Sequence, residues 1–287
     1  MAPLLRLAAV LGHALVPAVA QQAARPQLLL VGCFDAADST ACVEAALAAT
    51  PPPRSIVLPA QPTPYLIARP LFLRHSHQEL VIRAGAVLEA KPGAFRQFES
   101  CLLSADGVSD YTIRGESPAY YPPLLRMRRG DYTNESAYPT NKTSEGGGPV
   151  GHRHVLAIGT RYNRTKPTAG VRVLDLTVSL AGGDGLYIQN ATDVRLERVT
   201  ASDNFRQGMS AQQPLRSPRS DPASDDAPTR AGVIDVDGLA VNHSVFRDTK
   251  GVPPQAGVDL EPDTPSERLS NIVFENCEFV GNAGAGL

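Results

Sequence analysis

Side chains that can do acid–base chemistry fall in four short clusters in the second half of the chain. The clusters are His152-Arg153-His154, Asp184, Asp203 with Arg206 and Gln207, and Asp259 with Glu261. Asp259 and Glu261 stand two apart in a strand-like pattern, so their carboxylates point to one face and the apolar residues beside them to the other. Because two carboxylates can supply a general acid together with a base or a nucleophile, this outward pair indicates a catalytic site.

The candidate residues have structural interpretations as well as catalytic ones. Asp184 and Asp203 stand in tight turns, where aspartate is common because it hydrogen-bonds its own backbone. Arg206 could simply pair with a neighbouring aspartate, Asp203 or Asp259. The four clusters together are a stronger sign of a site than any one member. We take as catalytic candidates Asp184, Asp203, Arg206, Asp259, Glu261 and His154, and as candidates for substrate binding Arg153, Gln207 and Tyr187.

Metal binding is chemically compatible with two of the clusters. The two-residue spacing of His152 and His154 suits a metal, but the spacing shows no third ligand, so we do not expect zinc. Carboxylates such as those of Asp259 and Glu261 can also ligate Ca²⁺. We therefore expect no certain cofactor, and Ca²⁺ is the one metal left open.

The clusters lie on a repeat that is clearest in residues 171–210. An alternating apolar strand, a polar turn, a glycine and a second apolar strand occur twice there, and the equivalent glycines Gly185 and Gly208 are 23 residues apart. Self-similarity at such a period is typical of a solenoid. Period-2 strands between Gly, Asn and Asp turns, without helical spacing, predict an all-β solenoid. Stacked coils place equivalent turn positions about 4.8 Å apart, which would bring the four clusters to one junction.

The first half of the chain begins with a helix and continues with short strands. Residues 35–50 predict a short amphipathic helix that Asp38 or Ser39 caps and Pro51 ends. The strings I-V-L-P-A, Y-L-I, P-L-F-L and L-V-I-R-A-G-A-V-L follow. This order resembles the N-terminal region of secreted right-handed parallel β-helix proteins, the pectate-lyase-like superfamily. The resemblance implies a single-stranded right-handed parallel β-helix whose open end is covered by the capping helix.

The polar clusters extend the resemblance. The strings H-R-H-V, G-G-D-G-L-Y-I, D-N-F-R-Q-G-M and G-V-D-L-E-P, within roughly residues 152–261, look like a set that recurs in one group of right-handed β-helix proteins. Many proteins of that group are known only by their architecture, so the resemblance implies a fold more firmly than a reaction. The chain lacks the N-T-D, D-D and R-I-K strings of polygalacturonases, and Asp184 stands alone where that family has two aspartates. We therefore do not interpret it as a polygalacturonase.

A single domain accounts for most of the chain. Residues 1–20 predict a secretory signal peptide, with Arg6 before an apolar run and an Ala-Val-Ala cleavage site. We expect residues 21–287 to form the β-helix domain, with excursion loops at about residues 116–150 and 211–231. The chain ends inside a coil, and we expect either a truncated gene product or an end that a partner protects.

Cysteines and glycosylation motifs agree with export. Four cysteines are an even number for an oxidising compartment. Cys33 and Cys42 could close a small loop, whereas Cys101 and Cys277 are compatible with a bridge or with free buried thiols. The N-x-S/T motifs begin at Asn134, Asn141, Asn163, Asn190 and Asn242. We expect a secreted glycoprotein.

The composition of the chain gives no sign of a nucleic-acid partner or of a membrane span. A net charge of −2 gives no sign of a nucleic-acid partner, and no stretch after the signal peptide is apolar enough to span a bilayer. We expect a monomer that cleaves an acidic polysaccharide, as a lyase or a glycoside hydrolase, in a groove along the β-helix. A uronate epimerase and a non-catalytic glycan-binding or cell-surface structural protein are the alternatives. In the first excursion loop, sugar rings could stack on Tyr120, Tyr121, Tyr132 and Tyr138.

Overall fold

The computed structural model describes most of the predicted domain. The described residues are 27–29, 34–95, 100–116, 122–132, 153–159, 168–212, 235–262 and 268–287. The predicted signal peptide and Cys33 lie outside them, as do the first three glycosylation motifs. Export and the Cys33–Cys42 loop therefore stay predictions.

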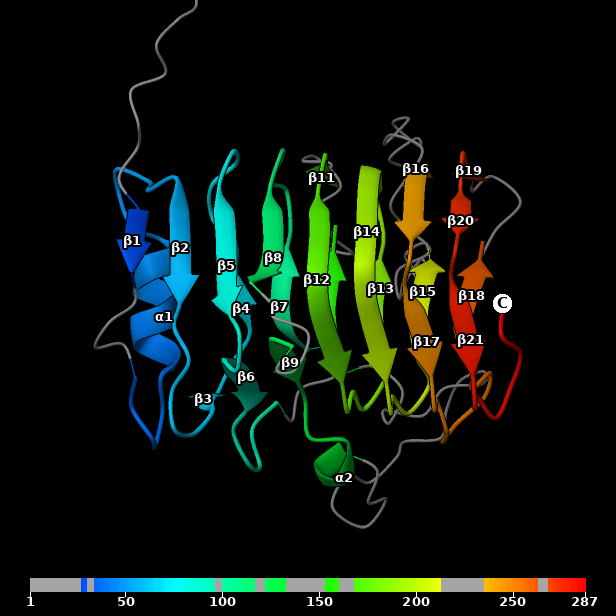
Figure 1. The fold of residues 1–287 in the computed structure, drawn as a ribbon, viewed down its shortest axis with the longest axis horizontal. Coiled ribbons are helices and arrows are strands. Elements are labelled where there is room, and N and C mark those ends of the chain that lie inside the picture. The colour runs from blue at the N-terminus through cyan, green and yellow to red at the C-terminus, as the bar shows by residue number, and fades with distance from the viewer. Residues whose placement is uncertain are drawn as a thin grey trace, which may run out of the picture.

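Two parallel sheets make up the described structure (Figure 1). The larger sheet follows the order β1 (Gln27–Leu29), β2 (Ser55–Leu58), β5 (Glu79–Arg83), β8 (Thr112–Glu116), β12 (Arg172–Ser179), β14 (Ala191–Ser202), β16 (Asp235–Asn242) and β19 (Arg268–Ser270). Its remaining strands are β3 (Tyr65–Ile67), β6 (Val87–Ala90), β9 (Leu124–Arg126), β11 (Thr168–Ala169), β17 (Val245–Arg247), β20 (Val273–Glu275) and β21 (Glu278–Val280).

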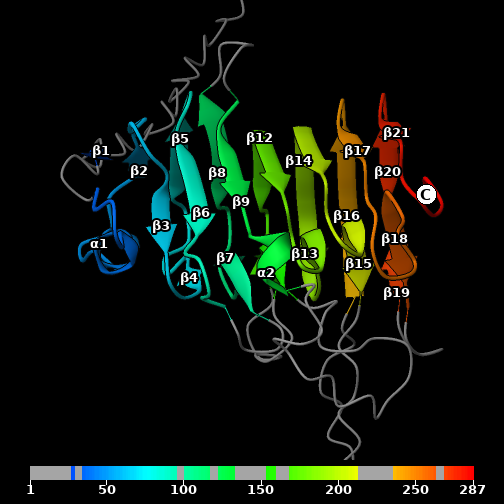
Figure 2. The same cartoon turned by 90° about the horizontal axis from the view of Figure 1, so that it is seen from below.

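The smaller sheet carries the predicted clusters. Its order is β4 (Leu71–Phe72), β7 (Cys101–Ala105), β10 (His154–Ile158), β13 (Asp184–Ile188), β15 (Gln207–Gln212) and β18 (Val258–Glu261). Figure 2 shows the strands of successive segments lying side by side along the molecule's long axis. The mostly β structure with parallel sheets is consistent with the parallel β-helix that the sequence predicts, whereas its handedness and the capping role of the helix stay predictions.

The repeat period found in the sequence is also the pairing register. Val173 of β12 pairs with Leu196 of β14, and Asp184 of β13 pairs with Gln207 of β15, so the 23-residue offset holds for one strand pair in each sheet. Parallel pairing in register stacks apolar side chains on one another, and the buried side chains of both sheets belong to one core cluster. The stack therefore holds β7, β10, β13 and β15 of the smaller sheet between two neighbours, whereas β4 and β18 are its edge strands.

The predicted helix is present as α1 (Thr40–Leu47). Ser39 is its N-cap residue, and the backbone N–H of Thr40 donates to Asp38 Oδ1 over 2.9 Å. Val43 and Leu47 are buried in the common core, which fixes the helix against the first strands. Figure 1 places α1 beside β1 and β2 at the N-terminal end of the stack.

The first excursion departs from its prediction. Within residues 116–150, β9 pairs with β6 and β12, so the sheet continues through the start of the predicted loop. The short helix α2 (Arg129–Tyr132) follows it. Tyr132 is buried in the core, which corrects the prediction that its ring is available to a sugar, whereas the other three tyrosines lie outside the described residues.

The cysteines and glycosylation motifs that the structure describes narrow two further predictions. Cys101 and Cys277 are free thiols, so they do not form the bridge that the sequence left open. Burial raises the pKa of Cys101 to about 12, which keeps it protonated. Asn190 is buried, and Asn242 is half-buried with its side chain bonded to Asn276. No helix in the described ranges is long and apolar enough to cross a membrane.

Candidate active site

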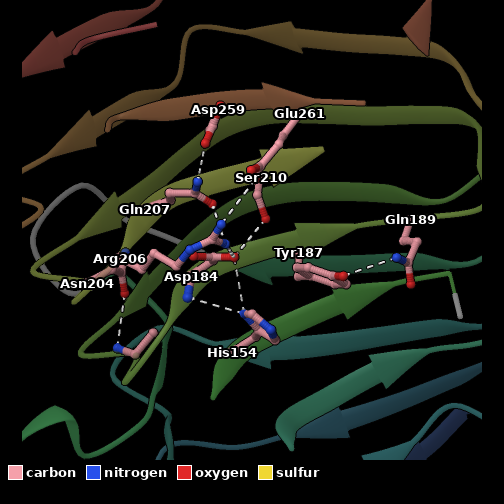
Figure 3. A network of polar contacts seen from close by, with 11 residues as sticks. His154, Asp184, Tyr187, Gln189, Asn204, Arg206, Gln207, Ser210, Asp259 and Glu261 are labelled. Atoms are coloured by element: carbon pink, nitrogen blue, oxygen red, sulfur yellow. Dashed lines mark hydrogen bonds and ion pairs between the residues drawn. The ribbon is translucent and has the colours of Figure 1, made fainter. Parts of the chain in front are cut away.

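The smaller sheet brings most of the predicted polar residues together (Figure 3). In the pairing register, Tyr187 of β13 stands beside Ser210 of β15, and Ser210 beside Asp259 of β18. His154 begins β10, on the other side of β13. The clusters that are far apart in the sequence therefore meet because their strands are consecutive neighbours in one sheet.

Asp259 and Glu261 share the outer face of β18, as the two-residue spacing predicts. Val258 between the sheets is buried, and Leu260 packs against the core, so the two carboxylates point away from it. Asp259 Oδ2 accepts a hydrogen bond from Gln207 Nε2. Both residues are half-buried, and 42% of the Glu261 side chain is exposed. The pair forms the accessible part of the network.

Arg206 connects the surface carboxylate to the interior. Its Nη2 donates to Glu261 Oε2 over 3.1 Å, while its Nη1 donates to Asp184 Oδ2 over 3.3 Å and to Gln207 Oε1 over 3.1 Å. The side chain is only 14% exposed. Burial works against its charge, but the carboxylates of Asp184 and Glu261 outweigh burial and raise the pKa of Arg206. Arg206 is therefore a fixed cation, paired with Asp184 and Glu261.

Asp184 lies beneath these groups with no exposed surface. Its Oδ2 accepts from Ser210 Oγ over 2.8 Å as well as from Arg206, whereas no described residue donates to its Oδ1. Burial raises the pKa of Asp184 to about 7; the Arg206 charge and the Ser210 hydrogen bond oppose this shift. A carboxyl that titrates near neutrality inside a network is typical of functional sites rather than of simple turns.

His154 supports Asp184 from the neighbouring strand. Its Nδ1 accepts a hydrogen bond from the backbone N–H of Asp184 over 3.2 Å and lies 3.4 Å from Asp184 Oδ2. Its ring stacks on Tyr187 with the ring centres 4.3 Å apart. Tyr187 in turn accepts a hydrogen bond at its hydroxyl from Gln189. His154 and Tyr187 are both buried, so the structure places them under the site rather than on its surface.

The glycines around Asp184 are required by close packing. A Cβ on Gly182 would lie 2.7 Å from the ring of Tyr132, and one on Gly185 would lie 2.5 Å from Asn204 Nδ2. Asn204 is buried, and its Oδ1 accepts from the backbone N–H of Ala181 over 3.0 Å. The G-G-D-G string is therefore more than a turn signal, because it lets two neighbouring segments pack directly against the strand that carries Asp184.

Two predicted residues lie apart from the network. Asp203 occupies a left-handed turn with φ of 57°, and its backbone carbonyl accepts from Arg129 Nη1 over 2.9 Å. This placement agrees with the turn role left open for it. Arg153 is buried, donates to the Phe95 carbonyl and lies over the ring of Tyr132.

Sequence reasoning missed Ser210, Asn204 and Gln189 as members of the network. The 23-residue register was the available signal for Ser210, because it aligns Ser210 with Tyr187.

Among the described residues, no group of three or more His, Cys, Asp or Glu side chains is arranged to hold a metal ion. Of the two carboxylates that the Ca²⁺ prediction invoked, Glu261 accepts from Arg206 Nη2 and Asp259 accepts from Gln207 Nε2.

Comparisons with known proteins point to the fold. No family model matches the chain, and no curated protein sequence matches it. A solved structure described as a "putative glycosyl hydrolase" from Parabacteroides merdae is similar, with a TM-score of 0.53 and 14% identity over 88% of this chain and 95% of that one. An endo-xylogalacturonan hydrolase from Aspergillus tubingensis gives a TM-score of 0.45 and 12% identity over 90% of this chain and 74% of that one. At these identities the likeness concerns the fold alone.

Proposed function

We propose that this chain hydrolyses glycosidic bonds of a polysaccharide, with Asp259 as the general acid and Glu261 as the general base. The observation that carries the proposal is the pair of carboxylates on one face of β18, held by Gln207 and Arg206 in two different environments. Two carboxyl groups whose surroundings push them toward different roles are the usual equipment for this reaction.

Asp259 suits the acid role. Burial and the neighbouring charge of Glu261 raise the pKa of Asp259, while Arg206 and the Gln207 hydrogen bond oppose the rise. A raised pKa keeps a proton available for the leaving oxygen of the glycosidic bond. Glu261 suits the role of activating water, because 42% of its side chain is exposed.

The strand geometry favours hydrolysis with inversion. Two residues along a strand advance by about 7 Å. Inverting glycosidases separate their carboxyl groups by about 6.5–9.5 Å to leave room for water, whereas retaining enzymes use about 5–5.5 Å. Asp259 and Glu261 lie on the same face with this backbone spacing, which supports a mechanism in which water attacks the anomeric carbon directly.

The alternative lyase mechanism fits the described site less well. Elimination needs a base that removes a proton next to the sugar carboxylate, and Arg206 is the cation nearest the acidic pair. Its raised pKa and its bonds to Asp184 and Glu261 make it a poor base. The fold shared with a protein described as a glycosyl hydrolase also supports hydrolysis, as an analogy between folds.

The proposal includes secretion of the enzyme and an acidic polysaccharide as its substrate. The predicted signal peptide places the enzyme outside the cell, where polysaccharides are accessible. N-terminal sequencing of the secreted protein tests this, because the proposal expects the mature chain to begin at Gln21. A mature chain that still carries residues 1–20 would contradict export by this route.

A panel of neutral and uronate-containing polysaccharides tests the reaction. We expect wild type to release reducing ends without the ultraviolet absorbance of unsaturated ends, and Asp259→Asn and Glu261→Gln to abolish the release. Control variants outside the network are Asp248→Asn, in a left-handed turn, and Glu278→Gln, on β21. Unsaturated products would favour the lyase, and binding without cleavage on the whole panel would favour a glycan-binding protein.

A further inference from the structure

Asp184 has no exposed surface, and it contacts three other side chains of the network. Its Oδ2 is approached by Ser210 Oγ at 2.8 Å, by Arg206 Nη1 at 3.3 Å and by His154 Nδ1 at 3.4 Å. Its backbone N–H is also bonded to His154. A side chain with no exposed surface does not touch a substrate. The Asp184 carboxyl therefore has a role other than direct catalysis.

The guanidinium of Arg206 provides that explanation. Its Nη1 points inward to Asp184, and its Nη2 points outward to Glu261, as Figure 3 shows. A guanidinium is a planar, rigid fork, so fixing one edge fixes the direction of the other. The inner contact with Asp184 therefore determines where the outer edge meets Glu261.

We propose that Asp184 is a positioning residue, whose buried carboxylate anchors Arg206 so that Arg206 holds the Glu261 carboxylate in its working orientation. The role of Glu261 in catalysis rests on the proposed hydrolase function, whereas the anchoring of Arg206 by Asp184 does not. The titratable and charged groups around Asp184 come from three places: His154 from the adjacent strand β10, Arg206 from the turn before the adjacent strand β15, and Asp259 and Glu261 from β18, the strand beyond β15.

The activity test compares wild type with Asp184→Asn across pH. The amide keeps an oxygen acceptor for Arg206 but removes the charge, and wild-type Asp184 gains that charge as pH rises through about 7. We expect the ratio of wild-type to variant kcat to be near one about two units below pH 7 and to reach about tenfold about two units above it, with KM changed by less than about twofold. A ratio that is constant or falls with pH would overturn the proposal, because a merely structural role does not follow this ionisation.

A second measurement does not depend on activity. Nitrogen-15 NMR of the Arg206 side chain reports whether rotation about its Cζ–Nη bonds is hindered. We expect separate Nη1 and Nη2 signals in wild type, and averaged signals in Asp184→Ala or, should that variant fail to fold, in Ser210→Ala, which removes the 2.8 Å bond to Oδ2. Ser104→Ala, a buried serine on β7, is the matched control and should keep separate signals.

The two arms separate failure of the positioning role from failure of the proposed function. Unchanged Arg206 signals in the variants would overturn the anchoring whatever the enzyme does. Averaged signals in a protein that cleaves no polysaccharide would support the anchoring and reject the hydrolase proposal.

Discussion

Two arginines on either side of the end of β14 make the same kind of contact in opposite surroundings. Arg198, on β14 of the larger sheet, bonds Asp175 Oδ1 over 2.6 Å and also bonds Glu197, with 49% of its side chain exposed. Arg206 of the smaller sheet bonds Asp184 and Glu261 with 14% exposed. In both cases carboxylate partners raise the pKa of the arginine, chiefly through the Asp175 hydrogen bond for Arg198 and against an opposing burial for Arg206.

The comparison shows what burial adds to an ion pair. Exposed ion pairs contribute about 0–1 kcal/mol because solvent and salt screen them. A buried charge is expensive unless every polar atom near it is bonded. Asp184 keeps one oxygen without a described donor and has its pKa raised to about 7, so the buried Arg206–Asp184 pair carries an electrostatic cost that the exposed Arg198–Asp175 pair avoids. A cost of this kind is typical of a functional site.

The largest effect that we expect is on catalysis through Asp259. Asp259→Asn removes the proposed general acid while preserving the acceptor for Gln207 Nε2. We expect kcat to fall by about 10³-fold, measured as the rate of reducing-end release. Asp248→Asn should retain the wild-type rate, and a comparable loss in that control would attribute the effect to general damage.

The second-largest effect that we expect distinguishes Arg206 from Arg198. Arg206→Ala removes the hydrogen bond from Nη2 to Glu261 and should lower kcat by about 10²-fold. Arg198→Ala should leave kcat unchanged, because its partners lie on the larger sheet. Equal losses in both variants would remove the distinction between the two sheets.

A third effect appears in the pH dependence of stability. Folding raises the pKa of Asp184 from 3.8 to about 7, so the folded state is favoured below pH 3.8 and loses that advantage as pH rises through 7. A shift of this size corresponds to about 4 kcal/mol. Relative to wild type, Asp184→Asn should therefore gain unfolding free energy from acid to neutral pH in urea titrations. A difference that does not change with pH would show that Asp184 titrates normally.

The smallest effect concerns the exposed ion pair. Arg198→Ala should change the free energy of unfolding by less than about 1 kcal/mol, and added salt should shrink the difference. Thermal melts at low and high ionic strength measure this. A loss of several kcal/mol would mean that solvent screens the Arg198 cluster less than its exposure indicates.

Much of the fold could be predicted from the sequence because solenoid strands repeat their chemistry. The spacing of Gly185 and Gly208 anticipated the register between β13 and β15. Alternation around Asp259 and Glu261 correctly indicated which face of β18 carries the acids. The continuation of the sheet into β9 was missed, since three residues flanked by prolines and polar residues show no period.

The candidate site was only partly predictable. Stacking correctly brought Asp184, Arg206 and Glu261 together, because equivalent turns of successive coils must coincide. Burial was not predictable, since it depends on which segments pack around each turn. The burial of His154 and Tyr187 therefore emerged only from the structure.

Stereochemistry at the newly formed reducing end tests the central claim most directly. Proton NMR of the first products of the wild-type enzyme distinguishes the two anomers before they equilibrate. The account predicts the anomer opposite to that of the substrate linkage, because two residues along β18 advance by about 7 Å, which falls within the range of carboxyl separations of inverting enzymes. A product that retains the configuration, or that carries an unsaturated end, would contradict it.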